Sequence, residues 1–190
     1  MKKQFAGLIA LALLIPLTGF AAGAATLGFQ AQTISVVAGE TTDVFVTYNA
    51  NGQSIDTVRS NITFDSTIVN VESVGLVGRF NRNTPGNFFD NQIGKISWGG
   101  FTLDGSVDDA GTFAKITFYG KQTGDALIVL DTDSKMISGG EEKINVSALG
   151  STTVKVNAAG ETDPGLSVIA VNSPTYLNEV DWYSLDTVEI

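Results

Sequence analysis

The sequence predicts an all-β domain in which two antiparallel sheets pack face to face as a β-sandwich. Val, Ile, Thr and Phe recur in short runs that Gly, Asn, Asp and Ser interrupt, a composition typical of strands joined by turns. Several runs alternate apolar and polar side chains, so that Val58, Ile62 and Phe64 share one face. A period of two puts one face of a strand in a core and the other in water. No stretch after residue 25 shows a helical period.

Nine strands are expected between residues 32 and 157. Their bounds are roughly 32–37, 42–49, 56–64, 68–77, 93–101, 112–121, 125–131, 142–148 and 151–157. Turn-forming sequences separate them, at 49–52 (Asn-Ala-Asn-Gly), 84–87 (Thr-Pro-Gly-Asn), 123–125 (Thr-Gly-Asp) and 139–140 (Gly-Gly). Residues 25–157 are numerous enough for one domain with its own core.

The first 24 residues have the pattern of a secretory signal peptide. Lys2 and Lys3 precede an uncharged apolar run over 5–20, and small residues follow, with Ala-Gly-Ala at 22–24 as the expected cleavage signal. A transmembrane anchor is the alternative, but the run is short for a span, which needs roughly 20 residues. We therefore expect export to the cell surface or the extracellular space.

Composition excludes several classes of function. The chain has 11 basic and 20 acidic residues and a formal charge of −9, which disfavours binding to nucleic acid. It contains neither His nor Cys, which removes Ser-His-Asp and Cys-His catalytic sites and the usual zinc sites. An enzyme of this composition would have to use carboxylates alone. No cluster of acidic residues indicates such a site, so we expect no catalytic residues.

Four segments resemble a known family. They are 36–44 (VVAGETTDV), 62–71 (ITFDSTIVNV), 111–118 (GTFAKITF) and 130–134 (LDTDS), the last followed by Gly139-Gly140 and Ile144. Together the segments resemble the cohesin domain, the module that binds dockerins in cellulosomes and related surface assemblies. The likeness covers roughly residues 32–157. It implies a nine-stranded jelly roll and a dockerin-like or other surface protein as partner, in a surface or extracellular polysaccharide-related assembly.

The family docks its partner partly on the strand before the aromatic-Asp pair. In this chain that strand would present Thr57, Arg59, Asn61 and Thr63 to water. Two family contact positions, usually Asn and Asp, fall on Thr57 and Arg59. This departure predicts a partner that differs from a standard dockerin. An ordinary solvated sheet face, as in a structural spacer of a surface array, is the alternative.

A carbohydrate-binding module is the second hypothesis, because such modules share this architecture. It would need exposed rings on one face, and Tyr119, Phe88 and Phe89 are the candidates. Trp98 shares a predicted face with Ile96 and is therefore expected in the core.

No cofactor is expected, although a structural calcium ion is an alternative. Aspartate oxygens suit calcium, and Asp104, Asp108, Asp131 and Asp133 are the candidate ligands. They do not form an EF-hand pattern, and aspartates in turns more often form local hydrogen bonds.

The composition of the sequence changes after residue 157. Residues 158–165 are small, polar and Pro/Gly-bearing, as in a linker. Residues 166–190 resemble the start of an Ig-like module of bacterial surface proteins, here truncated. An extension that packs on the sandwich is the alternative.

Overall fold

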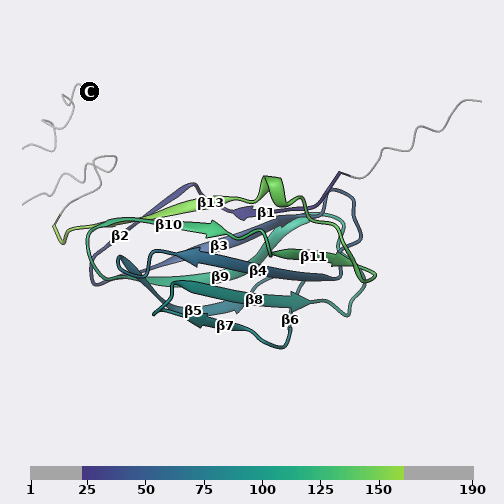
Figure 1. Cartoon of the computed structure of the whole chain (residues 1–190), viewed down its shortest axis with the longest axis horizontal. Coiled ribbons are helices and arrows are strands. Elements are labelled where there is room, and N and C mark those ends of the chain that lie inside the picture. The colour runs from purple at the N-terminus through teal and green to yellow at the C-terminus, as the bar shows by residue number, and fades with distance from the viewer. Residues whose placement is uncertain (1–22, 161–190) are drawn as a thin grey trace, which may run out of the picture.

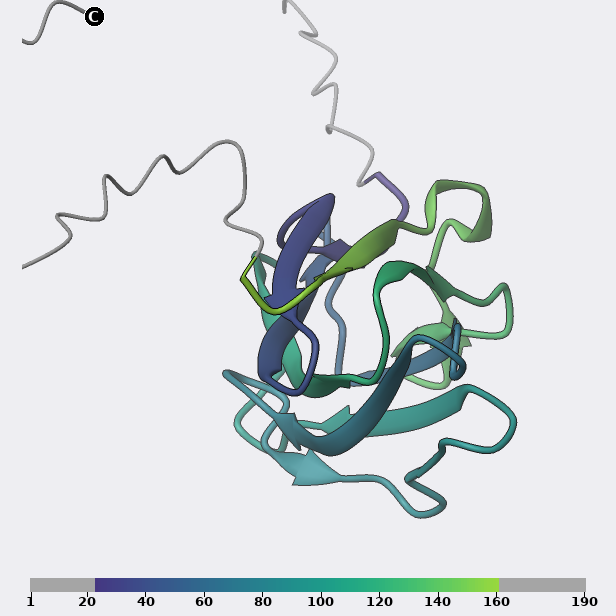
Figure 2. The ribbon, with the colours of Figure 1, turned by 90° about the vertical axis from the view of Figure 1, so that its left-hand side faces the viewer.

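The computed structural model describes residues 23–160, which form a sandwich of two sheets (Figure 1). The smaller sheet has the strand order β1-β3-β9-β5. Its strands are β1 (Thr26–Phe29), β3 (Thr41–Asn49), β9 (Ala110–Gly120) and β5 (Val69–Leu76). The end view in Figure 2 shows the strands of both sheets curling around a central core.

The larger sheet is built around β4 (Thr57–Phe64). Strand β8 (Lys95–Phe101) pairs with one side of β4. The other edge of β8 pairs with β6 (Arg82–Asn83) and β7 (Phe88–Asp90). Along its other side lie β10 (Gly124–Leu130) and β11 (Lys135–Ser138), each pairing with one half of β4. The short β12 (Glu141–Glu142) extends β11, while β13 (Ser151–Asn157) and then β2 (Thr33–Val37) extend β10.

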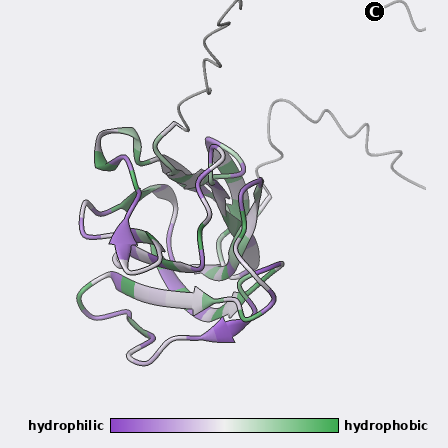
Figure 3. Cartoon of the chain, turned by 90° about the vertical axis from the view of Figure 1, so that its right-hand side faces the viewer, coloured by the Kyte–Doolittle hydropathy of each residue, from purple (hydrophilic) through white to green (hydrophobic). Residues whose placement is uncertain are grey.

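Alternating burial along the strands produces the core. In β4 every second side chain is buried, from Val58 to Phe64, and the same rule holds in β13 and in β9 from Ala114 onward. In Figure 3 hydrophilic and hydrophobic residues are interspersed along the chain. Phe80 lies fully buried between Tyr48 and Phe113, with edge-to-face ring contacts at 5.0 and 6.1 Å. Burial of apolar area in this core is the main stabilising term, since the chain has no disulfide.

The structure confirms the sandwich and eight of the nine expected strands. The ninth, over 142–148, is wrong. Only β12 is a strand there, and the segment continues into a 3₁₀ turn, η1 (Val146–Ala148). The Asn145 side chain accepts a hydrogen bond from the Ser147 amide at 3.1 Å. That local bond stabilises a turn in competition with a strand ladder.

The sheet pairing also differs from the expectation in detail. Strand β13 pairs with β2 in parallel, so the larger sheet is not wholly antiparallel. Strands β1, β6, β7 and β11 were not expected. Each has four residues or fewer, which is too short to show a clear periodicity.

The expected leader (1–24) lies outside the described residues except for its last two. So do the linker beyond residue 160 and the expected Ig-like module at 166–190. These assignments stay predictions. Between residues 23 and 160 the structure contains no helix with the length and hydropathy of a membrane span.

Candidate binding face

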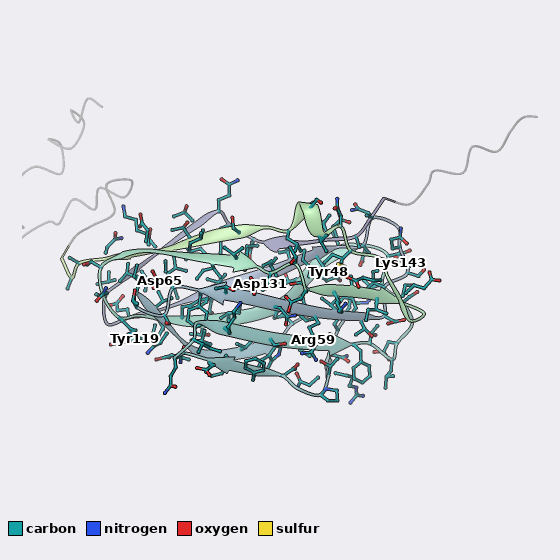
Figure 4. The ribbon with its side chains drawn as sticks, viewed as in Figure 1. Tyr48, Arg59, Asp65, Tyr119, Asp131 and Lys143 are labelled. Atoms are coloured by element: carbon teal, nitrogen blue, oxygen red, sulfur yellow. The ribbon has the colours of Figure 1, made fainter. Side chains whose placement is uncertain are left out.

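The four residues expected to face water on β4 do so. Thr57, Arg59, Asn61 and Thr63 are half-buried and alternate with buried neighbours, so they lie on the outer face of the larger sheet. Together with Lys95 and Ser97 of β8, Phe88 of β7 and Ile93 of the β7–β8 turn, they form what we name the β4 face. Figure 4 labels Arg59 and also Asp131, which bonds to Thr63 further along β4.

Arg59 holds the turn over 84–87 against the sheet. Its guanidinium donates to Ser97 Oγ at 2.8 Å, to Thr84 Oγ1 at 2.7 Å and to the Pro85 carbonyl at 2.7 Å. The turn is fixed from the other side by the Asn87 amide, which donates to the Gly99 carbonyl at 2.9 Å. A planar guanidinium with several donors is suited to such a junction. Arg59 therefore serves first as an internal clamp rather than as a free cation.

Glycine at 99 makes room for this clamp. A Cβ atom at position 99 would overlap Thr84 Oγ1 and would lie 3.1 Å from an Arg59 guanidinium nitrogen. The turn and the guanidinium can therefore cross β8 only where that strand has no side chain.

A second network covers the other end of β4. Lys95 Nζ donates to Thr63 Oγ1 at 2.6 Å and to Asp131 Oδ2 at 2.9 Å, and Thr63 donates to Asp131 at 2.8 Å. Asn61 Nδ2 donates to the Asp133 carbonyl at 3.1 Å. These contacts join β4 and β8 to the β10–β11 turn, so the polar groups are held in place before any partner arrives.

Exposed apolar side chains lie beside this polar network. Phe88, Ser97 and Asn61 are in register across β7, β8 and β4, which puts all three on one face. Phe88 is 49% exposed and Ile93 is 65% exposed. A shallow pocket of about 280 Å³ lies between them and the polar network, lined also by Lys95, Asp131 and Asp133. The face thus combines apolar contact area with fixed hydrogen-bonding groups, as protein interfaces do.

The three rings expected for sugar stacking do not share a face. Phe88 and Phe89 are consecutive on β7 and point to opposite sides of the larger sheet. Tyr119 is on β9 and faces outward from the smaller sheet. Trp98, expected in the core, packs against it while remaining partly exposed. No flat platform is therefore formed by the candidate rings.

The four candidate calcium ligands are also dispersed. Asp104 and Asp108 lie in the loop before β9, and Asp131 and Asp133 in the β10–β11 turn. Within residues 23–160 no three acidic side chains come close enough together to hold a metal ion. The Asp131 carboxylate is instead occupied by Thr63 and Lys95.

Sequence reasoning missed Lys95, Ser97, Ile93 and the 84–87 turn as parts of this face. Their positions depend on the pairing of β4 with β8, which no local pattern reveals. Of these residues, Ile93 could have been predicted from the sequence, since a large apolar residue inside a polar turn is a candidate for contact with a partner.

No family model matches the sequence, and no curated protein resembles it closely enough to count as a relative. Solved structures do resemble it. A cohesin module of a family 33 glycoside hydrolase from Clostridium perfringens aligns with a TM-score of 0.58 and 12% identity, over 72% of this chain and 99% of that module.

Two further cohesins give similar values. The third ScaC cohesin of Acetivibrio cellulolyticus, solved in complex with the ScaB dockerin, has a TM-score of 0.56 and 20% identity, over 70% of this chain and 98% of that one. A non-cellulosomal cohesin from the archaeon Archaeoglobus fulgidus has a TM-score of 0.57 and 13% identity, over 71% and 92%. The domain at residues 23–160 therefore has the cohesin fold.

Proposed function

We propose that this chain is a non-catalytic, exported binding module that attaches a dockerin-like protein through its β4 face. The observation that carries the proposal is the juxtaposition on one sheet of a fixed polar network and an exposed apolar pair, Phe88 and Ile93. The cohesin fold supports it, because several structures with this fold were solved with a dockerin bound.

The chemistry of the face defines what the partner must offer. Phe88 and Ile93 supply the apolar area that would anchor an interface, and Asn61, Lys95 and Asp131 supply fixed polar groups around it. Lys95 and Asp131 neutralise each other, whereas Asp133 has no basic partner within the described residues. The face therefore favours a partner with an apolar patch bordered by a basic side chain.

Affinity capture tests the proposal. The purified chain is immobilised and exposed to culture medium and native lysate, first with calcium and then with a chelator. Dockerin folding needs calcium in the family, so we expect a protein with paired acidic calcium loops to be retained only when calcium is present.

Variants of the chain assign the capture to a surface. Phe88→Ala and Ile93→Ala should weaken capture, while Tyr119→Ala, a change on the other sheet, should leave it unaltered. Capture that resists both changes on the β4 face, or that persists unchanged in the chelator, would contradict the proposal.

A further inference from the structure

A groove that shares no lining residue with the pocket of the β4 face lies where the chain passes from one sheet to the other. Strand β1 belongs to the smaller sheet and β2 to the larger one. Between them Gln30 still donates to the Phe45 carbonyl of β3 at 3.0 Å, while the Gln32 carbonyl already accepts from Thr153 of β13 at 2.9 Å. This irregular passage leaves a hollow of about 770 Å³, which we name the β1 groove.

Glycines form part of the groove wall. A Cβ atom on Gly150 would lie 2.8 Å from the Cα of Gly28, so the two backbones are in contact there. Gly28 itself has open space above it: a Cβ would meet only Thr47 Oγ1, at 3.7 Å. Glycine at position 28 therefore keeps the groove open, although the surrounding packing would also accommodate a side chain there.

No charged residue lines the groove, although the chain has 11 basic and 20 acidic residues. Besides Tyr48, which is buried, and Asn49, whose side chain accepts a hydrogen bond from the Asn51 amide at 2.9 Å, its polar lining consists of hydroxyl and amide side chains from six residues, Thr26, Gln30, Gln32, Thr47, Thr112 and Ser151. All six are half-buried or exposed.

These six side chains differ from the polar groups of the β4 face in one respect. Within residues 23–160 none of their hydroxyl or amide groups makes a hydrogen bond to another part of the chain, whereas the side chains of Arg59, Thr63 and Lys95 each make two or more. Amide and hydroxyl groups can both donate and accept, so the groove offers many unused hydrogen-bonding positions without a formal charge.

We propose that the β1 groove binds a neutral polysaccharide. A chain of uncharged sugar rings offers hydroxyl groups that donate and accept along its length, which matches the free amides and hydroxyls of the lining. A polyanion finds no cation in the lining and is repelled by the acidic chain. This site is separate from the β4 face and does not use Tyr119, Phe88 or Phe89.

Affinity electrophoresis of the chain tests the proposal. Native gels contain hydroxyethyl cellulose, xyloglucan or galactomannan as neutral probes, and polygalacturonate as the acidic probe. We expect at least one neutral polymer to retard the chain and polygalacturonate not to do so.

Two matched variants locate the binding. Gly28→Val places a β-branched side chain in the groove and should abolish the retardation. Gly75→Val makes the same change on β5 of the same sheet, where a Cβ meets nothing within 4 Å, and should have no effect. Gln32→Ala removes one amide and should weaken binding about fivefold, the size expected for one hydrogen bond. Thermal melting confirms that each variant is folded.

Several outcomes would overturn the proposal. The proposal is wrong if no neutral polymer retards the chain, or if Gly28→Val is retarded as strongly as the unmodified chain. It is also wrong if Gly75→Val loses the retardation together with Gly28→Val. Stronger retardation by polygalacturonate would also overturn it. A change in the sedimentation of the chain caused by Gly28→Val, without any retardation, would identify the groove as a self-association surface instead. Capture of a protein by the β4 face should be unaffected by Gly28→Val, so the two proposals can fail independently.

Discussion

Replacing Arg59 with alanine should destabilise the chain and loosen the turn that precedes Phe88. The change removes three hydrogen bonds, two to half-buried hydroxyl groups and one to an exposed carbonyl. Taking about 1 kcal/mol for each half-buried bond, and nothing for the exposed one because water replaces it, gives a loss of about 2 kcal/mol. The Thr84 hydroxyl keeps its hydrogen bond to Asn87 Oδ1 at 3.2 Å, so no larger cost is expected.

Urea unfolding at neutral pH measures this loss. Arg82→Ala is the matched control, because Arg82 is an exposed arginine on β6 that makes no side-chain hydrogen bond within the described residues. A surface change of that kind should stay within about 0.5 kcal/mol of the unmodified chain. Hydrogen exchange gives the local readout. The Thr84 amide, bonded to the Gly99 carbonyl at 3.0 Å, and the Gly99 amide, bonded to Asn87 Oδ1 at 2.7 Å, should exchange faster in Arg59→Ala.

If Arg59 clamps the turn, the free energy of unfolding should be lower for Arg59→Ala than for Arg82→Ala. If Arg59→Ala and Arg82→Ala have the same stability within error, and the Thr84 and Gly99 amides keep their exchange rates, Arg59 is not a clamp. Its side chain would then be free for a partner, and the turn that precedes Phe88 would be held by the Asn87 side chain and the Thr84 amide.

Three further changes test this packing, the core and one surface hydrogen-bonded turn. Gly99→Ala should cost about 1–3 kcal/mol in unfolding free energy, because the new methyl group would displace Thr84, and a variant of unchanged stability would contradict this packing. Phe80→Ala should cost about 3–5 kcal/mol by the same measurement, since the ring is fully buried, and a loss below 1 kcal/mol would mean that the ring is not in the core. Asp65 should stabilise the chain only above acidic pH. Hydrogen bonds from Thr67 hold the pKa of Asp65 below its ordinary value of 3.8, so its contribution is present above that pH and is lost as the pH falls through the lower folded-state value. Since the carboxylate is exposed, the stability of Asp65→Asn should differ by less than about 1 kcal/mol at neutral pH, and this difference should vanish in acid.

The strands that could be predicted are those whose burial has a clear period. The sequence around Val58, Ile62 and Phe64 alternates without interruption, so both the strand and the outward position of its polar residues were predictable. The stretch at 142–148 shows the limit of this signal. Ile144 and Val146 alternate with polar residues, yet Val146 is exposed and lies in a 3₁₀ turn that the Asn145 side chain stabilises. Two alternating apolar residues favour a strand too weakly to compete with one local hydrogen bond that stabilises a turn.

The composition of the binding face was less predictable than its central strand. Residues of β4 could be placed from their own alternation, but Phe88 and Ser97 join them only because β7, β8 and β4 pair in one register. The role of Arg59 was equally hidden. A charged residue on an outward face suggests contact with a partner, and only the fold shows that the 84–87 turn takes up its donors. Long-range pairing thus decides which outward groups remain available.

The β4 face and the β1 groove differ in whether their polar groups are already bonded within the chain, and therefore in the entropy that binding a ligand would cost. On the β4 face the polar groups are already bonded to one another, so little conformational entropy is lost when a rigid partner covers them, and the exposed Phe88 and Ile93 provide the favourable area. In the β1 groove the amides and hydroxyls of the six residues named above are unbonded within the described chain and can rotate to suit their ligand. Such groups add little to a flat protein contact but can follow the repeated hydroxyls of a sugar chain. A domain with both surfaces could hold a protein on the β4 face while the β1 groove contacts a polysaccharide, and Phe88→Ala and Gly28→Val would each remove one of these contacts and leave the other intact.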